Sequence, residues 1–220
     1  MVQYTHILIA SFLESVIKPE NLGEYYWEAI APDVRYLASM RRAQTHLSSK
    51  VILDDMNRYP QLNSFLQGYL VHCLTDEVKL KDIVFRNFPL VLFKNKISYQ
   101  QMMMIFEFYN LEEHKTAVQI TGKHNEMLTD LGLREAHSLK YLLSVNSYLS
   151  ADYSEPMLKD LLALMGLEKD SRLEKYMAAA ESFQKNQLLK KFFFSHFRKN
   201  QTNEKIVRMV KSSLPEKMWG

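Results

Sequence analysis

The feature that most constrains the fold of this chain is the spacing of apolar residues between positions 61 and 79. Apolar side chains recur there at intervals of three and four, which places them along one face of an α-helix. They are Leu62, Phe65, Leu66, Tyr69, Leu70, Cys73 and Leu74. Glycine and proline, which interrupt helices, number only six each among 220 residues. We therefore predict an all-α protein rather than one built on a sheet.

Other segments show the same helical spacing or begin with residues that favour a helix start. We predict further helices over residues 4–17, 51–57, 98–110, 112–131, 134–149, 154–166, 171–196 and 203–212. The first should end at Lys18, because the residue before Pro19 avoids the α region. The Met-rich stretch from Met102 to Phe108 is expected in the core, since methionine fills irregular gaps. No segment alternates polar and apolar residues over a useful length, so the predicted architecture is a multi-helix bundle.

The length and the absence of a Gly-rich or Ser-rich linker predict a single helical domain over residues 1–220. Within it we expect a metal-site region over residues 1–85 and a basic helical segment over residues 187–220. Residues 7–13 are apolar, but Glu14 interrupts them, which favours a buried helix over a signal peptide. No run reaches the roughly 18 apolar residues of a membrane span, and a cytoplasmic location is expected.

The histidines carry the first indication of chemistry. Of the seven, only His72 has an acidic residue at the fourth following position, Asp76. Residues four apart share one helical face, where an imidazole and a carboxylate can chelate one metal ion. A hydrogen-bonded His–Asp pair with a purely structural role fits the same pattern, so the pair alone leaves both readings open. Cys73 is the only cysteine, which excludes an internal disulfide and a cysteine-rich zinc module.

Short motifs elsewhere give this pair a context. They are Thr5-His6, Ala31-Pro32-Asp33, Thr45-His46 and the run Gly68-Tyr69-Leu70-Val71-His72-Cys73-Leu74-Thr75-Asp76. In this order and at similar spacings, they resemble the metal-binding motifs of the zinc-dependent phospholipase C family, which is related to P1 nuclease. The resemblance covers roughly residues 4–80, the N-terminal part of the chain.

The resemblance implies a helical fold of the phospholipase C/P1 nuclease type and a set of metal ligands. Asp33, His46, His72 and Asp76 would hold one metal ion, and Asp76 would bridge to a second ion shared with His6. The implied cofactor is zinc or another divalent transition metal, as one or two ions, and a mixed His/Asp set suits such metals. Asp33 would also be the catalytic base toward metal-bound water.

Two departures from the family pattern limit the expected site. The phospholipases have a further histidine six residues past the bridging aspartate, where this chain has Asp82. They also have a later His-x-x-x-Glu motif, whereas no later histidine here has an acidic residue at that spacing. The sequence therefore predicts an incomplete site that holds one metal ion, or two at most.

The leading hypothesis is a metal-dependent hydrolase of phosphoesters, with phospholipid as the substrate that the resemblance implies. The alternative is a non-catalytic helical protein that keeps a structural metal site and binds an anionic partner through a basic tail. A nuclease is a third reading, which the missing ligands oppose. Arg41 and Arg42 precede His46 and are either phosphate-binding groups or a solvated pair on a loop.

The basic tail carries more than the whole net charge of the protein. Residues 187–217 contain eight Lys or Arg and two Glu, a net charge of +6 in a chain whose total is +3. The run from Lys190 to Lys199 mixes these bases with phenylalanines. It fits a helix whose phenylalanine face packs on the body, a peripheral contact with an anionic membrane, or, least favoured, a nucleic-acid contact. In the membrane reading, Phe192, Phe193 and Phe197 would supply apolar area.

Overall fold

The computed structural model describes residues 3–78, 83, 98–114, 120–150, 178 and 181–218. These ranges contain helices and no strands, which confirms the predicted all-α class for the described part of the chain. The helix predicted over residues 154–166, and the first part of the one predicted over residues 171–196, lie outside the described residues.

The helices fall into two groups along the chain. The first group contains α1 (Gln3–Ile17), α2 (Leu22–Glu28), α3 (Arg35–Ala38), α4 (Arg42–Thr45), α5 (Ser49–Arg58) and α6 (Asn63–Glu77), with the 3-10 turns η1 (Ala31–Val34) and η2 (Pro60–Leu62). The second group contains α9 (Tyr99–Glu113), α10 (Glu126–Asp130), α11 (Glu135–Ser150), α14 (Gln187–Lys199), α15 (Thr202–Ser213) and the turn η3 (Glu216–Met218).

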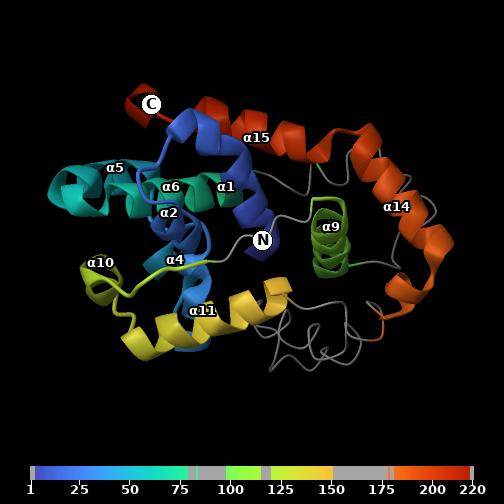
Figure 1. The fold of residues 1–220 in the computed structure, drawn as a ribbon, viewed down its shortest axis with the longest axis horizontal. Coiled ribbons are helices and arrows are strands. Elements are labelled where there is room, and N and C mark those ends of the chain that lie inside the picture. The colour runs from blue at the N-terminus through green and yellow to red at the C-terminus, as the bar shows by residue number, and fades with distance from the viewer. Residues whose placement is uncertain are drawn as a thin grey trace.

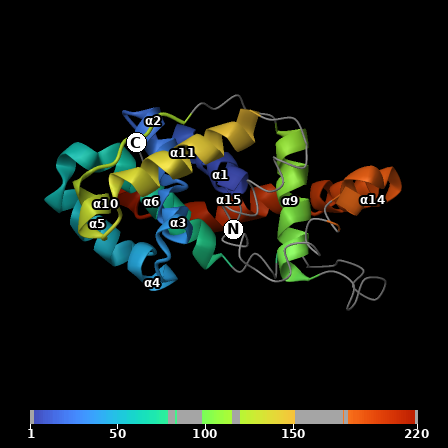
Figure 2. The same ribbon diagram turned by 90° about the horizontal axis from the view of Figure 1, so that it is seen from below.

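Helix α9 crosses its neighbours steeply. Figure 1 shows it nearly end-on, and Figure 2, turned by 90°, shows its length. The N-terminal end of α1 lies beside α9 in both views. In Figure 1, α15 and α14 follow one another along the top and right, and α11 lies below α1. None of the described helices is both long and apolar enough to cross a membrane.

Helices α2 and α6 touch at Gly68. A Cβ atom at this position would overlap the carbonyl oxygen of Tyr25, so only glycine permits such a close approach. The Tyr25 hydroxyl in turn donates a hydrogen bond of 3.0 Å to the carbonyl of Ala10 in α1. Three helices of the metal-site region are thereby held at fixed separations around a buried apolar core.

Two predictions about individual elements are confirmed. α1 ends at Ile17, and Lys18 adopts a positive φ of 51° before Pro19. The Met-rich face of α9 is buried in the core, with Met102 at 0% and Met104 at 1% exposure.

The continuous helix predicted over residues 112–131 is wrong. α9 ends at Glu113, and residues 120–125 are not helical. The side-chain amide of Asn146 holds this segment, accepting from the Ile120 amide at 3.1 Å and donating to its carbonyl at 3.0 Å.

A close contact explains why this segment stays out of a helix. Gly122 lies so near Trp27 that a Cβ atom would overlap the indole side chain. The helix then restarts at α10, where the Asn125 side chain accepts a hydrogen bond of 3.0 Å from the Leu128 amide. Such tertiary contacts override the local preference that the apolar spacing indicated.

Helix α14 packs its aromatic face on the body of the protein. Phe193 and Phe197 are both 0% exposed. The ring of Phe197 lies 5.1 Å from that of Phe106, and Phe193 lies 5.7 Å from Phe183, between centroids. Neither phenylalanine is therefore available as apolar area for an external partner, contrary to the membrane reading of the sequence. Phe192 remains 39% exposed.

Part of the basic charge of α14 is paired with the end of α9. Lys190 Nζ lies 2.5 Å from Glu112 Oε1. Arg198 forms two hydrogen bonds with the Glu113 carboxylate, at 2.7 and 2.6 Å. These contacts are partly exposed, so their contribution to stability is small, but they remove two of the charges that an anionic partner would meet.

A buried carboxylate from α9 caps the N-terminus of α1. Glu107 accepts hydrogen bonds from the Tyr4 amide at 2.7 Å, and from the Thr5 amide and hydroxyl at 3.0 and 2.7 Å. The Tyr148 hydroxyl donates a further bond of 3.2 Å. The first amides of a helix have no partner within it, and the helix dipole favours a negative charge there. Glu107 therefore fixes the end of α1.

The capping group belongs to a buried polar chain that joins α1, α9 and α15. The Asn110 amide donates to the Thr5 hydroxyl at 2.9 Å. Asn203, in the first turn of α15, donates to Asn110 Oδ1 at the same distance. His6 follows directly on this anchored turn. These hydrogen bonds therefore help to fix the position of a predicted metal ligand.

Replacing Glu107 by glutamine should destabilise the fold. Each carboxylate oxygen of Glu107 accepts two hydrogen bonds. In glutamine an NH2 group replaces one of these oxygens, so it would point its hydrogens at two donors. We expect the free energy of unfolding in urea to fall by about 1–3 kcal/mol. The control is Glu113→Gln on the same helix, which loses only a partly exposed ion pair and should change the value far less. Equal losses in both variants would contradict the capping role.

Glu107 also predicts a pH dependence of stability. Burial raises its pKa from the ordinary 4.5 to about 7. The folded state then binds the proton more tightly than the unfolded state, so this contribution to stability is present below about pH 4.5 and is lost as pH rises through about 7. The unfolding free energy of the wild type should therefore fall across this interval relative to that of Glu107→Gln. Parallel pH profiles of the two proteins would refute the assignment.

Candidate metal centre

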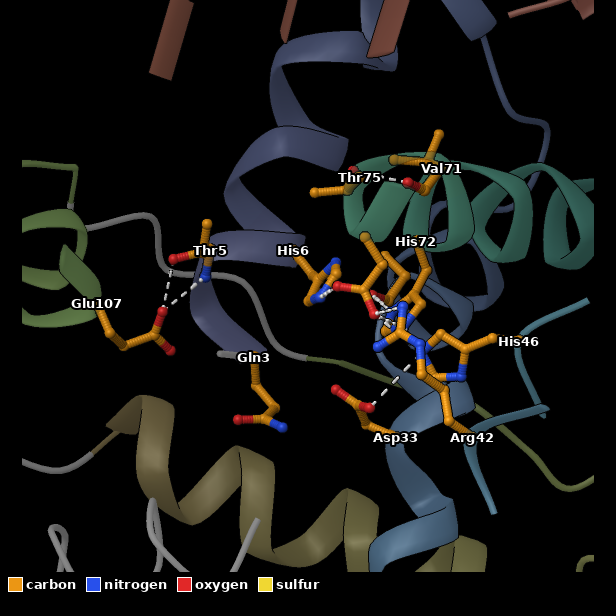
Figure 3. A network of polar contacts seen from close by, with 12 residues as sticks. Gln3, Thr5, His6, Asp33, Arg42, His46, Val71, His72, Thr75 and Glu107 are labelled. Atoms are coloured by element: carbon orange, nitrogen blue, oxygen red, sulfur yellow. Dashed lines mark hydrogen bonds and ion pairs between the residues drawn. The ribbon is translucent and has the colours of Figure 1, made fainter. Parts of the chain in front are cut away.

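Five side chains from separate segments meet between α1, α4 and α6. His6 comes from α1, Asp33 from η1, His46 from the end of α4, and His72 and Asp76 from α6. Figure 3 shows the labelled members turned toward one another. The predicted convergence of the five residues is therefore confirmed, and their role as metal ligands stays a prediction.

Three atoms form the centre of this cluster. His46 Nε2 lies 2.9 Å from Asp76 Oδ2 and 3.1 Å from His72 Nε2. His72 Nε2 lies 3.8 Å from the same Asp76 oxygen. Ligand atoms about 2.0–2.2 Å from a tetrahedral metal ion are about 3.3–3.6 Å apart. The observed separations bracket this range, so small adjustments would let the three atoms coordinate one ion.

His72 is held in the tautomer that a metal ligand needs. Its Nδ1 lies 2.8 Å from the carbonyl oxygen of Ala29, which can only accept, so Nδ1 carries the proton. Burial lowers the pKa of His72 to about 3, so the ring is neutral and Nε2 presents a lone pair. A carbonyl on the second nitrogen is a common way of orienting a metal-binding histidine.

His46 Nε2 faces two acceptors at once, the bare Nε2 of His72 and a carboxylate oxygen of Asp76. Its other nitrogen, Nδ1, lies 3.2 Å from the hydroxyl oxygen of Thr45. If Nδ1–H donates to this hydroxyl, all three central atoms carry lone pairs, and a cation between them would stabilise the arrangement. With the proton on Nε2 instead, this single N–H is shared between the two neighbours. The donor set therefore fits a metal ion that replaces one proton.

Asp33 completes the cluster from η1. Its Oδ1 lies 4.0 Å from His46 Nε2 and 3.6 Å from Arg35 Nε. Its Oδ2 is buried and has no hydrogen-bond partner among the described residues. Buried carboxylate oxygens are normally paired, so this oxygen points to a ligand that it would accept from or bind.

His6 faces the second oxygen of Asp76. Its Nε2 lies 3.4 Å from Asp76 Oδ1 without hydrogen-bond geometry, and neither ring nitrogen has a hydrogen-bond partner in the described ranges. The ring stacks on His72 with centroids 4.0 Å apart. Burial lowers the pKa of His6 to about 3, so the ring is neutral. The two oxygens of Asp76 thus face different histidines, as the predicted bridging role requires.

The side chains of the cluster are almost wholly buried. The side chains of its five members are between 0% and 7% exposed. Arg42 is 49% exposed, and its Nη2 lies 2.7 Å from Asp76 Oδ2. Arg42 of α4 is thus a partly exposed side chain in direct contact with the cluster.

The members of the cluster were predicted from the sequence, but the groups that contact them were not. Arg35 beside Asp33, and the Ala29 carbonyl beside His72, gave no sequence signal because both depend on how η1 and α2 pack against α6. Arg41 and Arg42 were predicted to be either phosphate-binding groups or a solvated pair on a loop. Arg42 instead lies in α4, where it contacts Asp76. The departure at Asp82 lies outside the described residues.

Comparisons of the chain with known protein families, with curated proteins and with solved structures find no match. The resemblance to the phospholipase C family stays a prediction that rests on the short motifs quoted above.

Replacing His72 by alanine should remove metal binding and its stabilising effect together. A ligand that binds only the folded state raises the melting temperature, and removing it with a chelator reverses the effect. We expect chelator to lower the melting temperature of zinc-loaded wild type and to leave that of His72→Ala almost unchanged. His196→Ala, on the distant α14, is the control and should respond like wild type. Equal chelator responses of wild type and His72→Ala would contradict a metal at this place.

Proposed function

We propose that this protein is a hydrolase of phosphoesters that depends on zinc or another divalent transition metal. The supporting observation is the meeting of His46 Nε2, His72 Nε2 and Asp76 Oδ2 within 3.8 Å of one another. Neutral imidazoles with carboxylates form a donor set that suits zinc and similar ions. A bound ion of this kind supplies Lewis-acid polarisation of a phosphoryl oxygen and lowers the pKa of water.

We assign the other roles in the reaction to residues of the cluster and its neighbours. His46, His72 and Asp76 would hold the ion, and the Ala29 carbonyl keeps His72 in the correct tautomer. Asp33 places Oδ1 toward His46 and leaves Oδ2 without a partner among the described residues. That oxygen is the group we assign to accept the proton of the attacking water.

His6 and Asp76 would define a second metal position next to the first. Asp76 Oδ1 faces His6 and Asp76 Oδ2 faces His46, so the carboxylate could contribute to both positions. A second ion, if bound, would add positive charge near the phosphoryl group. The incomplete family pattern favours slow hydrolysis of simple phosphodiesters, and the resemblance names phospholipid as the substrate class to test first.

A second candidate function is a structural metal site in a non-catalytic protein. The observation that favours it is the burial of the donors, since His6 and His72 are 0% exposed and Asp33 is 1% exposed. A closed shell of four protein ligands leaves no position for water. In this case the exposed basic residues of the tail, including Lys191 and Lys199, would bind an anionic partner through charge alone.

Replacing Asp33 by asparagine separates the two candidates. Asparagine keeps a carbonyl oxygen for the ion but cannot accept a proton, so hydrolysis of a chromogenic phosphodiester should fall about 100-fold or more. The wild-type rate should rise as pH passes about 7. Metal content, measured on the same samples, should stay close to that of wild type. Asp54→Asn, an exposed aspartate of α5, is the control.

Unchanged activity in Asp33→Asn would remove this residue from the mechanism. If zinc-loaded wild type hydrolyses neither the phosphodiester nor phospholipid vesicles, the structural-metal candidate is the correct one.

A further inference from the structure

Arg42 is the one partly solvated side chain that reaches into the centre of the cluster within the described ranges. Its guanidinium is 49% exposed, yet Nη2 lies 2.7 Å from the buried Asp76 Oδ2. In Figure 3, Arg42 extends from α4 toward the cluster beside His46. No other hydrogen-bond partner of this side chain occurs among the described residues, so the remaining donors of its fork are available to solvent or to a ligand.

The oxygen that Arg42 contacts is the one assigned to the metal. Asp76 Oδ2 also lies 2.9 Å from His46 Nε2 and 3.8 Å from His72 Nε2. An ion about 2.0–2.2 Å from this oxygen would be within about 5 Å of the guanidinium. Two cations at that distance repel strongly in a partly buried place. Arg42 and the ion therefore compete for the same carboxylate.

The local structure allows the Arg42 side chain to rotate away from Asp76 without moving the predicted ligands. Arg42 and His46 belong to one helical turn, because the His46 amide donates to the Arg42 carbonyl at 2.9 Å. The backbone that carries His46 is thereby fixed, while the long and half-exposed arginine side chain can rotate outward. A rotation about its side-chain bonds leaves all the ligand atoms in place.

The tyrosines near Arg42 add no negative charge that would oppose an anion at this place. Tyr36 and Tyr99 are near enough to Asp76 and Arg42 to feel their charges, and burial raises the pKa of Tyr36 to about 12. Both phenols are therefore neutral at physiological pH and add no negative charge. Arg42 is a half-exposed cation beside Asp76, with Arg35 also nearby, and its planar fork matches two oxygens of a phosphate.

We propose that Arg42 is a displaceable gate: it neutralises Asp76 before the metal binds, is displaced from Asp76 Oδ2 by the metal, and then binds the phosphate group of the substrate. This inference rests on the proposed function, because it assigns the metal to Asp76 Oδ2. It adds a residue that opposes metal loading and promotes phosphate binding, two effects that a merely structural arginine would not combine.

The first test is zinc affinity, measured by competition with a chromophoric chelator and without substrate. Arg42→Gln removes the competing charge, so zinc should bind about tenfold more tightly than to wild type. Arg42→Lys keeps the charge and should resemble wild type more closely. Lys50→Gln removes one exposed positive charge from the neighbouring α5 and should leave the affinity unchanged.

The second test is binding of inorganic phosphate to the zinc-loaded proteins by calorimetry. Arg42→Gln should bind phosphate about tenfold more weakly than wild type, because a charge-assisted hydrogen bond is lost. Arg42→Lys should lie between the two, since lysine keeps charge but not the fork. Similar melting temperatures of the metal-free proteins show that the variants are folded.

Equal zinc affinities of wild type and Arg42→Gln would overturn the gate, and equal phosphate affinities would overturn its second role. Either result leaves the proposed function standing. If wild type binds no zinc at all, the proposed function itself fails, and the gate fails with it.

Discussion

The contact of α2 with α6 at Gly68 sets the geometry on which the rest of the cluster depends. It brings the carbonyl of Ala29 to His72 Nδ1, and that bond fixes both the tautomer and the orientation of the central imidazole. His46 and His6 both contact His72, the first edge-on and the second by stacking. A side chain at position 68 would force the helices apart and move the lone pair of His72 away from Asp76.

Neutral imidazoles this close to a buried carboxylate do not themselves supply the positive charge that would balance it. The buried rings are too poorly solvated to carry protons readily, as the low pKa of His6 and His72 shows. Positive charge must then come from outside the rings. Arg42 supplies part of it at Asp76, and Arg35 lies beside Asp33. The divalent ion proposed above would be another source of such charge.

Much of the fold followed from local sequence patterns, and the failures have a common cause. The helices around Leu66 and Met104 were predictable because their apolar spacing reflects burial directly. The break at Gly122 was missed because it arises from contact with Trp27, which is distant in the sequence. The members of the cluster were predicted from short motifs that resemble those of the phospholipase C family.

The environment of those ligands was not predictable in the same way. Glu107 reaches the first turn of α1 across the molecule, and nothing in its neighbouring residues distinguishes it from an ordinary helical glutamate. Arg42 was singled out only by its place before His46. Contacts of this kind depend on the relative placement of whole helices, which a single sequence does not reveal.

The separation of the capping contacts along the chain has a consequence for how the protein folds. The contacts among His46, His72 and Asp76 span only 26 and 30 positions. The bonds that anchor the first turn of α1 to Glu107 span 103 and 102 positions. Loop closure delays such distant contacts relative to near ones. The half of the cluster built from residues 46–76 should therefore assemble early, and His6 should join it only after α9 has docked.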